Sequence, residues 1–292
     1  MRNLKEHAMP ERDGYPPGVP CWVDTSQPDP DAAAAFYRGL FGWQTENTMP
    51  PGSEAKYLVA RLRGGDVAAI SSPPDGAQGP VAWNTYIWVD SADETAAKVR
   101  EAGGNVMAEP FDVFGAGRMA VFSDPEGAVF SVWQAREHRG ARIVNEPGAL
   151  NFNGLNTRDV GRAQSFYSAV FGWGTLSLPS GQMWTLPGYG DYLERLTPGI
   201  RAMTAQFGAP GFEDVVAAII PVAGDDPATL AHWNVTFGTD DADAAAERAA
   251  GLGGEVLVPP SDGPFVRMTV LRDPQGATFT ASKFVPENKD LA

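Results

Sequence analysis

The feature that most constrains this sequence is an internal repeat of three short motifs. Residues 36–43 read FYRGLFGW and residues 166–173 read FYSAVFGW, with five of the eight positions identical. The other two motifs follow in the same order in both halves: WNTYIWVD at 83–90 with WNVTFGTD at 233–240, and DPEGAVF at 124–130 with DPQGATF at 273–279. Motifs that recur in one order at similar spacing indicate a duplication, so the chain is expected to contain two similar domains.

The length, charge and cysteine content of the chain argue against several classes of binding partner. The repeat divides 292 residues into two units of ordinary domain size. A net charge of −14 argues against a nucleic-acid partner, which calls for a basic surface, and against an anionic membrane surface. The single cysteine, Cys21, permits no intrachain disulfide and allows a reducing compartment. The sequence shows neither a secretory signal nor an apolar run of membrane-helix length, so we expect a cytoplasmic monomer or homodimer.

Each half reads as two modules of one strand, one helix and three strands. In the first module, DPDAAAAFYRGLF is a helix that Asp29 or Asp31 can cap and that Gly42 ends. Gly64-Gly65 between two apolar runs is a hairpin signal. The pattern restarts at residue 81, and the second half repeats the plan. These patterns predict an α+β protein.

The expected domain boundaries follow from the repeat and from Pro- and Gly-rich stretches. The segments are a flexible arm at 1–18, a first domain at 19–136, a linker at 137–148, a second domain at 149–285 and a tail at 286–292. The WN motifs are 150 residues apart and the helix motifs 130, so about 20 residues are inserted in the second domain. We expect a helical insert near 189–209, which either covers a cavity or packs at the domain interface.

The paired modules resemble the vicinal oxygen chelate superfamily, which includes glyoxalase I, extradiol dioxygenases and the bleomycin and fosfomycin resistance proteins. The resemblance rests on FY-x-x-x-FGW in the first helix and DP-x-G before the last strand, and it covers about 19–285. PCWVDT and WTLPGYGDYLER are similar to a two-domain, glyoxalase-like branch of antibiotic-producing bacteria, some of whose members accompany aromatic polyketide biosynthesis. The resemblance implies two tandem domains, each a pair of βαβββ modules forming a curved antiparallel sheet around a cavity.

The resemblance also implies positions for metal ligands, where the metal enzymes of the family carry His or Glu. In this sequence the matching positions hold Trp22, Asn84 and Ser131 in the first domain, and Phe152, Asn234 and Thr280 in the second. None of these is a usual ligand of a divalent metal, so we expect no metal cofactor in either domain. Of the three histidines, only His232 lies near such a position in the sequence, and a surface role is the commoner one there.

Residues two apart in a strand share a face of the sheet, so the implied ligand positions predict which neighbouring side chains line each cavity. The first cavity is expected to be lined by four aromatic residues, Trp22, Tyr86, Trp88 and Trp133, with Asp24, Asn84 and Ser131 as polar points. The second is expected to be lined by Phe152, Asn156, Asn234, Thr236 and Thr280, with Trp184 from the neighbouring strand. Aromatic walls with a few polar anchors are typical of small-molecule pockets, although the same residues can simply fill a core.

Two classes of function fit this pattern. The first is metal-independent binding of a flat apolar or aromatic small molecule, for sequestration or for metabolite biosynthesis. The second is an enzyme on such a molecule, either a glyoxalase-like lyase or isomerase or an auxiliary to hydroxylation. Asp24 would then be the general base, with Asn84 and Ser131 as donors to a developing oxyanion. We expect the first cavity to be the principal site, because the second has Gly154 where Asp24 would stand.

Overall fold

The computed structural model describes residues 10–74, 80–178, 181–205, 210–222 and 230–291. The first domain contains β1 (Pro20–Ser26), α1 (Pro30–Phe41), β2 (Gln44–Asn47), β3 (Tyr57–Leu62), β4 (Gly65–Ser71), β5 (Trp83–Trp88), α2 (Ala92–Glu101), β6 (Asn105–Val113), β7 (Gly117–Ser123) and β8 (Val129–Ala135). Its sheet has the strand order β2-β3-β4-β1-β5-β8-β7-β6, and the two modules join where β1 pairs antiparallel with β5. The expected pair of βαβββ modules is confirmed.

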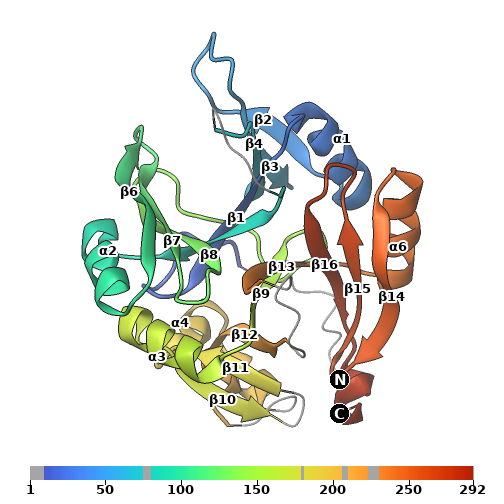
Figure 1. Ribbon diagram of the computed structural model, residues 1–292. Coiled ribbons are helices and arrows are strands. Elements are labelled where there is room, and N and C mark those ends of the chain that lie inside the picture. Colours follow the sequence, from blue (N-terminus) through green and yellow to red (C-terminus); the bar gives the residue numbers. More distant parts are fainter. Residues whose placement is uncertain (1–9, 75–79, 179–180, 206–209, 223–229, 292) are drawn as a thin grey trace.

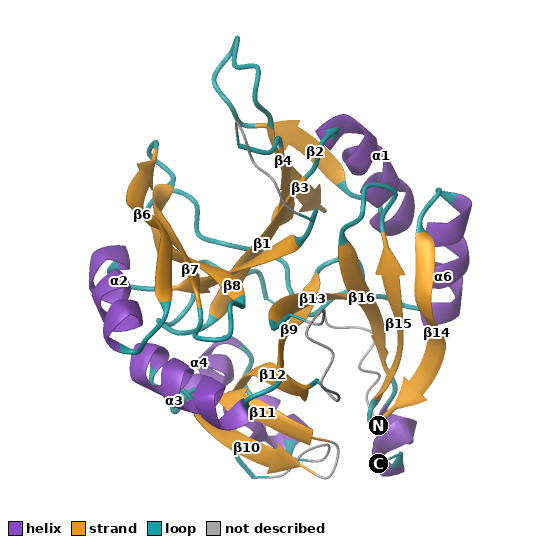
Figure 2. Ribbon diagram, viewed as in Figure 1, coloured by secondary structure: helices purple, strands orange, loops and turns teal. Residues whose placement is uncertain are grey.

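The second domain repeats this plan, as Figure 1 shows. It contains β9 (Leu150–Thr157), α3 (Val160–Phe171), β10 (Gly174–Leu178), β11 (Gly181–Thr185), α4 (Tyr189–Leu196), α5 (Ile200–Thr204), a 3-10 helix (Phe212–Asp214), β12 (Val215–Pro221), β13 (His232–Gly238), α6 (Ala242–Gly251), β14 (Glu255–Gly263), β15 (Val266–Arg272), β16 (Thr278–Phe284) and a second 3-10 helix (Pro286–Asp290). The strand order is β10-β11-β12-β9-β13-β16-β15-β14, with β9 paired antiparallel to β13. Both sheets are strongly curved (Figure 2).

The first helix of each domain begins and ends as its sequence dictates. The carboxylate of Asp29 accepts hydrogen bonds from the backbone of Asp31 and Ala32, which caps α1, and Asp159 caps α3 in the same way. Gly42 and Gly172 end the two helices with φ values of 77° and 71°, which glycine adopts without strain. The repeated FGW motif therefore places a helix stop directly before a buried tryptophan.

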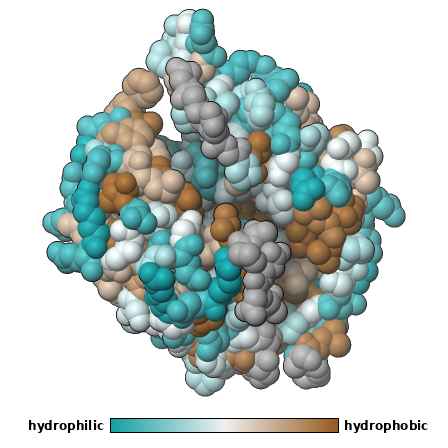
Figure 3. Space-filling model, viewed as in Figure 1, coloured by the Kyte–Doolittle hydropathy of each residue, from teal (hydrophilic) through white to brown (hydrophobic). Residues whose placement is uncertain are grey.

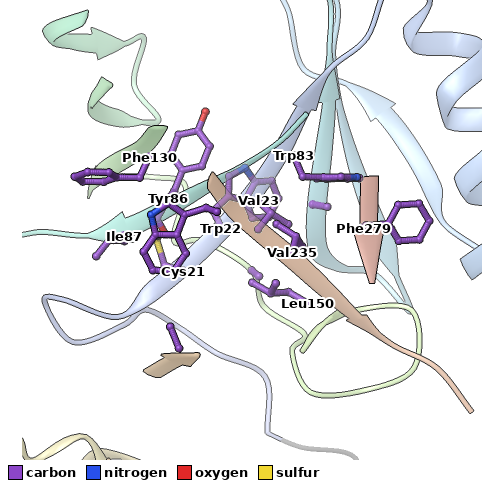
Figure 4. Packing of buried hydrophobic residues seen from close by; sticks show 14 of the residues in the cluster. Cys21, Trp22, Val23, Trp83, Tyr86, Ile87, Phe130, Leu150, Val235 and Phe279 are labelled. Atoms are coloured by element: carbon purple, nitrogen blue, oxygen red, sulfur yellow. The ribbon is translucent and has the colours of Figure 1, made fainter. Parts of the chain in front are cut away.

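The helices join the two domains to each other. Helix α1 of the first domain lies beside α6 of the second, and α3 of the second lies beside α2 of the first (Figures 1 and 2). The apolar side of α1 includes Phe36 and Tyr37, which are buried together with Phe279 of β16 in one cluster that spans both domains. Figure 4 shows part of this cluster, with Trp83 and Val23 from the first domain and Val235, Leu150 and Phe279 from the second.

The N-terminal segment corrects one expectation. Residues 10–18, expected to belong to a loose arm, are packed: Arg12 is 3% exposed and Tyr15 is 8% exposed. The Tyr15 hydroxyl donates a hydrogen bond to the carbonyl of Ala141, and the backbone of Arg12 donates to Arg142. The segment expected to be a linker, 137–148, is therefore also part of the packed structure. Residues 1–9 lie outside the described residues.

The insert of the second domain contains the helices α4 and α5, whereas residues 206–209 of the expected range lie outside the described residues. The Tyr192 hydroxyl donates to the carbonyl of Gly14 at 2.7 Å, and the Arg12 guanidinium lies 5.6 Å from the Tyr192 ring centre. These contacts tie the insert to the N-terminal segment of the first domain, at the domain interface. The tail is ordered in part, because Asn288 donates to the carboxylate of Asp262. Among the described helices, none has the length and apolar character needed to cross a membrane.

Candidate functional site

Strand register places the expected residues of the first domain on one side of its sheet. In β1 and β5, Trp22 lies opposite Tyr86 and Asp24 lies opposite Asn84. In β5 and β8, Tyr86 lies opposite Ser131 and Trp88 lies opposite Trp133. Residues opposite each other share a face, so these seven side chains belong to one surface, which is the inner side of the curved sheet. We call it the first concave face.

Asp24 is the centre of a hydrogen-bond network on this face. Its Oδ2 accepts hydrogen bonds from the hydroxyls of Tyr86 at 2.7 Å and Tyr57 at 3.2 Å, and its Oδ1 accepts one from Nδ2 of Asn84 at 2.9 Å. The Trp22 indole donates to the Tyr57 hydroxyl at 3.0 Å. Asp24 is only 4% exposed, yet neutral donors satisfy much of its hydrogen-bonding capacity.

Burial sets the proton affinity of this network. Loss of hydration raises the pKa of Asp24, and the hydrogen bonds from Asn84, Tyr86 and Tyr57 partly oppose that rise. Burial and the neighbouring carboxylate also raise the pKa values of Tyr57 and Tyr86 well above the usual range. In the described part of the chain, no lysine or arginine forms an ion pair with Asp24. The carboxylate therefore has partners but no counter-charge among these residues.

The sequence missed Tyr57, although it donates to Asp24. Tyr57 begins β3, two strands away from β1, and it lies opposite Ser71 of β4. Alternation along β4 and the pairing of Asp24 with Ala69 put Tyr57 on the first concave face. The face on which Tyr57 lies depends on the register of the β3–β4 hairpin. The Gly64-Gly65 turn predicts a hairpin, but it does not determine which residues of β3 point to which face.

His138 also corrects the sequence analysis, which placed only His232 near a site. The His138 ring packs edge-on against Trp22 with ring centres 4.4 Å apart, and it lies 5.5 Å from Trp133. Its backbone carbonyl accepts a hydrogen bond from the Trp133 indole. Among the described residues, the buried Nε2 atom of His138 has no hydrogen-bond partner, and burial lowers the pKa of the ring. His138 thus packs against two aromatic residues of the first concave face.

Trp88, at the end of β5, is covered by residues outside the sheet. The Tyr15 ring lies 6.1 Å from it, and the Arg139 guanidinium lies 5.5 Å from its ring centre. The backbone of Gly18 donates to the Trp88 carbonyl at 2.8 Å. These contacts make Trp88 part of the core that holds the N-terminal segment, which is the alternative that the sequence left open for the aromatic residues.

The rim of the first concave face remains apolar and accessible. Val129 of β8 and Phe111 of β6 are 40% and 44% exposed, and Met107 is also exposed. Figure 3 shows apolar side chains over β6 and β7, beside a hollow that separates them from the β2–β4 side of the sheet. An exposed apolar rim next to a polar centre is a common feature of ligand sites.

The second concave face has smaller residues at the matching positions. Phe152 lies opposite Thr236, which lies opposite Thr280, and Asn234 lies opposite Gly154. All of these except Gly154 are partly exposed. Gly154, Thr236, Gly238 and Ser282 occupy the positions of Asp24, Tyr86, Trp88 and Trp133. The second face therefore lacks the carboxylate and most of the aromatic floor of the first.

Three other expected residues of the second domain can now be placed. Trp184 lies opposite Ala217 and faces away from the concave side, where its ring packs against Tyr167 and Trp173. The expectation that Trp184 lines the second cavity is therefore wrong. Asn156 is partly exposed and donates to the His232 carbonyl, and His232 is exposed.

The side chains at the implied metal positions do not fit a divalent metal. Trp22 presents an indole N–H that already donates to Tyr57, and Asn84 turns its amide nitrogen toward Asp24. A metal needs several lone-pair donors at one point, and the indole of Trp22 and the phenyl ring of Phe152 supply none. Over the described ranges, no three His, Cys, Asp or Glu side chains are grouped as a metal site requires.

Comparison with known proteins agrees with this architecture. The family model described as Glyoxalase/Bleomycin resistance protein/Dioxygenase superfamily matches residues 22–132 and 148–280. The chain is 40% identical over 284 residues to "Putative glyoxylase CFP32" of Mycobacterium bovis, covering 96% of this chain and 100% of that protein. It is 35% identical over 286 residues to "Anthracycline biosynthesis protein DnrV" of Streptomyces peucetius, covering 91% of this chain and 93% of that protein.

Solved structures show the same fold at low sequence identity. The Mn(II)-bound glyoxalase from Novosphingobium aromaticivorans is 17% identical with a TM-score of 0.59, and the match covers 91% of this chain and 82% of that one. The 2,3-dioxygenase LapB from Pseudomonas sp. KL28 is 12% identical with a TM-score of 0.56, and the match covers 91% and 93% of the two chains. At these identities the likeness concerns the fold alone.

Proposed function

The chain belongs to the glyoxalase/bleomycin resistance protein/dioxygenase superfamily, and on that premise we propose that it binds a flat apolar or aromatic small molecule without a metal. The observation that carries the proposal is the Asp24 network. Next to Asn84, which occupies one of the positions that carry metal ligands in the family's metal enzymes, this chain has a buried carboxylate held by Tyr57, Tyr86 and Asn84. The first concave face is thus organised by hydrogen bonds among its own side chains.

The walls of this face support a flat ligand. The buried aromatic residues Trp22, Tyr86 and Trp133 form the floor around the network, and the exposed side chains of Phe111 and Val129 form the rim. Flat rings stack well on aromatic side chains, and apolar surface at a rim adds a further contribution when it is covered. A relative named for anthracycline biosynthesis is consistent with this class, because anthracyclines are planar polycyclic aromatic molecules.

An occlusion experiment tests the choice of face. Val129→Trp would fill the rim of the first concave face without removing a hydrogen bond of the Asp24 network. Thr278 occupies the matching position on β16, so Thr278→Trp is the matched control in the second domain. We expect Val129→Trp to weaken binding of a planar aromatic probe, measured by calorimetry, roughly tenfold or more, with Thr278→Trp near the wild type. If only Thr278→Trp weakens binding, the site lies in the second domain. If neither variant weakens binding, the ligand binds to neither concave face.

Catalysis on the same ligand is the second candidate, and one observation favours it. Burial raises the pKa of Asp24, which is what a general base needs in order to work near neutral pH. However, Asn84 donates to Asp24 itself, so it is not aimed at a developing oxyanion. Asp24→Asn separates the two functions: an enzyme that uses this base would lose roughly 10²-fold or more in turnover with little change in affinity. A variant with full turnover would remove Asp24 from the mechanism.

A further inference from the structure

We propose that the ligand of the first concave face carries a protonated amine, which Asp24 receives through Oδ1. This inference rests on the proposed function for its location and adds the chemical class of the ligand. It follows from three properties of the Asp24 site: a spare acceptor position, a missing counter-charge and aromatic surroundings.

The first property comes from counting hydrogen bonds. Each oxygen of an ionised carboxylate can accept about two hydrogen bonds. Oδ2 already accepts two, from Tyr86 and Tyr57, whereas Oδ1 accepts only the one from Asn84. Ala69 of β4 and Asn84 of β5 lie opposite Asp24 on the two neighbouring strands, and the alanine side chain has no hydrogen-bond donor. One acceptor position on Oδ1 therefore remains for a group that arrives from the concave side.

The second property concerns charge. All three donors to Asp24 are neutral, and in the described ranges no lysine or arginine is paired with it. A buried carboxylate without a cation is costly, so a ligand that brings positive charge gains more here than at a paired site. A neutral donor such as a phenol would complete the hydrogen bond but would leave the charge uncompensated.

The third property is the aromatic surroundings of the carboxylate. Tyr57 and Tyr86 contact Asp24 directly, and the Trp22 indole is hydrogen-bonded to Tyr57. These tyrosines present their hydroxyl edges to Asp24, and their rings surround the carboxylate with apolar surface that keeps water away, which strengthens an ion pair formed there. The second concave face has Gly154 in place of Asp24 and Thr236 in place of Tyr86. The preference for an amine should therefore belong to the first face alone.

The experiment compares two probes of the same shape. 1-Naphthylmethylamine is cationic at pH 7 and 1-naphthalenemethanol is neutral, and calorimetry measures the affinity of each. We expect the wild type to prefer the amine by roughly tenfold or more, because a charge-assisted hydrogen bond is stronger than a neutral one. Asp24→Asn should reduce that preference to about twofold or less. Asp90→Asn removes the same charge from an exposed position two residues after β5 and should keep the wild-type preference.

The possible outcomes separate this inference from the proposed function. If the wild type binds both probes equally and Val129→Trp weakens both, the aromatic site stands and the amine inference fails. If Asp24→Asn retains the preference, or Asp90→Asn loses it, the preference comes from general charge and the assignment to Asp24 is wrong. If neither probe binds, both proposals fail.

Discussion

The hydroxyl of Tyr37 donates a hydrogen bond to Oδ2 of Asp273 at 2.9 Å, although the residues are 236 positions apart and lie in different domains. The repeat makes the same contact in the other direction, because the Tyr167 hydroxyl donates to Asp124 at 3.2 Å. The tyrosine of each FYxxxFGW motif is therefore held by the aspartate of the DP-x-G motif in the other domain. Two signatures that identify the family in the sequence meet at the joint between the domains.

The third repeated motif takes part in the same contact. Trp83 donates its indole hydrogen to the Tyr37 hydroxyl at 3.0 Å, and Trp233 donates to Tyr167 at 2.9 Å. Gln27 adds a second side-chain donor to Oδ2 of Asp273 at 2.7 Å. The aspartate also accepts backbone hydrogen bonds from Gln275 and Ala277, which shape the turn. The side chain of the DP-x-G aspartate Asp273 is thus engaged in structural hydrogen bonds.

Tyr37→Phe should destabilise the whole protein. The change removes one donor to Asp273 and leaves the buried Trp83 indole without its acceptor, so we expect a loss of about 1–3 kcal/mol in the free energy of unfolding. Urea denaturation followed by circular dichroism measures it. Tyr167→Phe should cost a similar amount, because its contacts are the same. A Tyr37→Phe protein that unfolds at the wild-type urea concentration would show that the contact adds nothing to stability.

Trp173 and Trp184 offer a matched test of one hydrogen bond. Both are almost fully buried and both pack against Tyr167. The Trp173 indole donates to the carbonyl of Gly18 at 2.8 Å, whereas the buried Trp184 indole nitrogen has no partner among the described residues. Trp173→Phe should therefore cost about 1 kcal/mol more than Trp184→Phe in urea unfolding. Equal costs would mean that ring packing alone decides both.

Asp24 should make stability depend on pH in a defined direction. Because burial raises its folded pKa, the folded state holds the Asp24 proton more tightly than the unfolded state does. The stability that this group contributes is complete below the ordinary aspartate pKa of about 4, and it is lost as the pH rises through the folded pKa. The free energy of unfolding of the wild type, minus that of Asp24→Asn, should fall as pH rises above about 4. Urea titrations of both proteins at several pH values would show a constant or rising difference if this is wrong.

Metal removal should leave binding unchanged. The positions that carry ligands in the family's metal enzymes hold Trp22, Asn84 and Ser131 in the first domain; the Trp22 indole donates to Tyr57 and the Asn84 amide donates to Asp24. Protein treated with EDTA and dialysed should bind a planar aromatic probe with wild-type affinity, and metal analysis should find well under one equivalent per chain. One tightly held equivalent, with binding lost after its removal, would contradict the proposed function.

The sequence predicted most of the fold because its strongest signals are local and repeated. Motif order gave two domains, and alternation in β1, β5 and β8 placed Trp22, Asp24, Asn84 and Ser131 on one face. These strands carry or adjoin a recognisable motif, so their phase could be set from the sequence. Strand β11 contains no such motif, so the face on which Trp184 lies could not be set from the sequence. A shift of one residue puts a side chain on the other face of the sheet.

The remaining errors concern segments whose structure is set by distant contacts. Residues 10–18 and His138 lie in polar, Gly- and Pro-rich stretches that read as loops, and they are loops. Their burial depends on Trp88, Trp22 and the insert of the second domain, which are far away in the sequence. Local amino-acid composition indicates which backbone conformations a segment prefers. The packing contacts of these segments form with distant residues and exist only in the folded protein.

The crossed tyrosine–aspartate contacts have a consequence for the synthesis of the chain. All eight strands of the first sheet have left the ribosome once residue 135 is exposed, yet the packing of α1 against Phe279 and the Tyr37–Asp273 hydrogen bond must wait until residues 273–279 follow. Contacts of such long sequence separation form late and slow the search for the native state. During that interval Tyr37 and Phe41 lack the cover that Phe279 gives them, and apolar surface exposed on a partly folded chain favours aggregation.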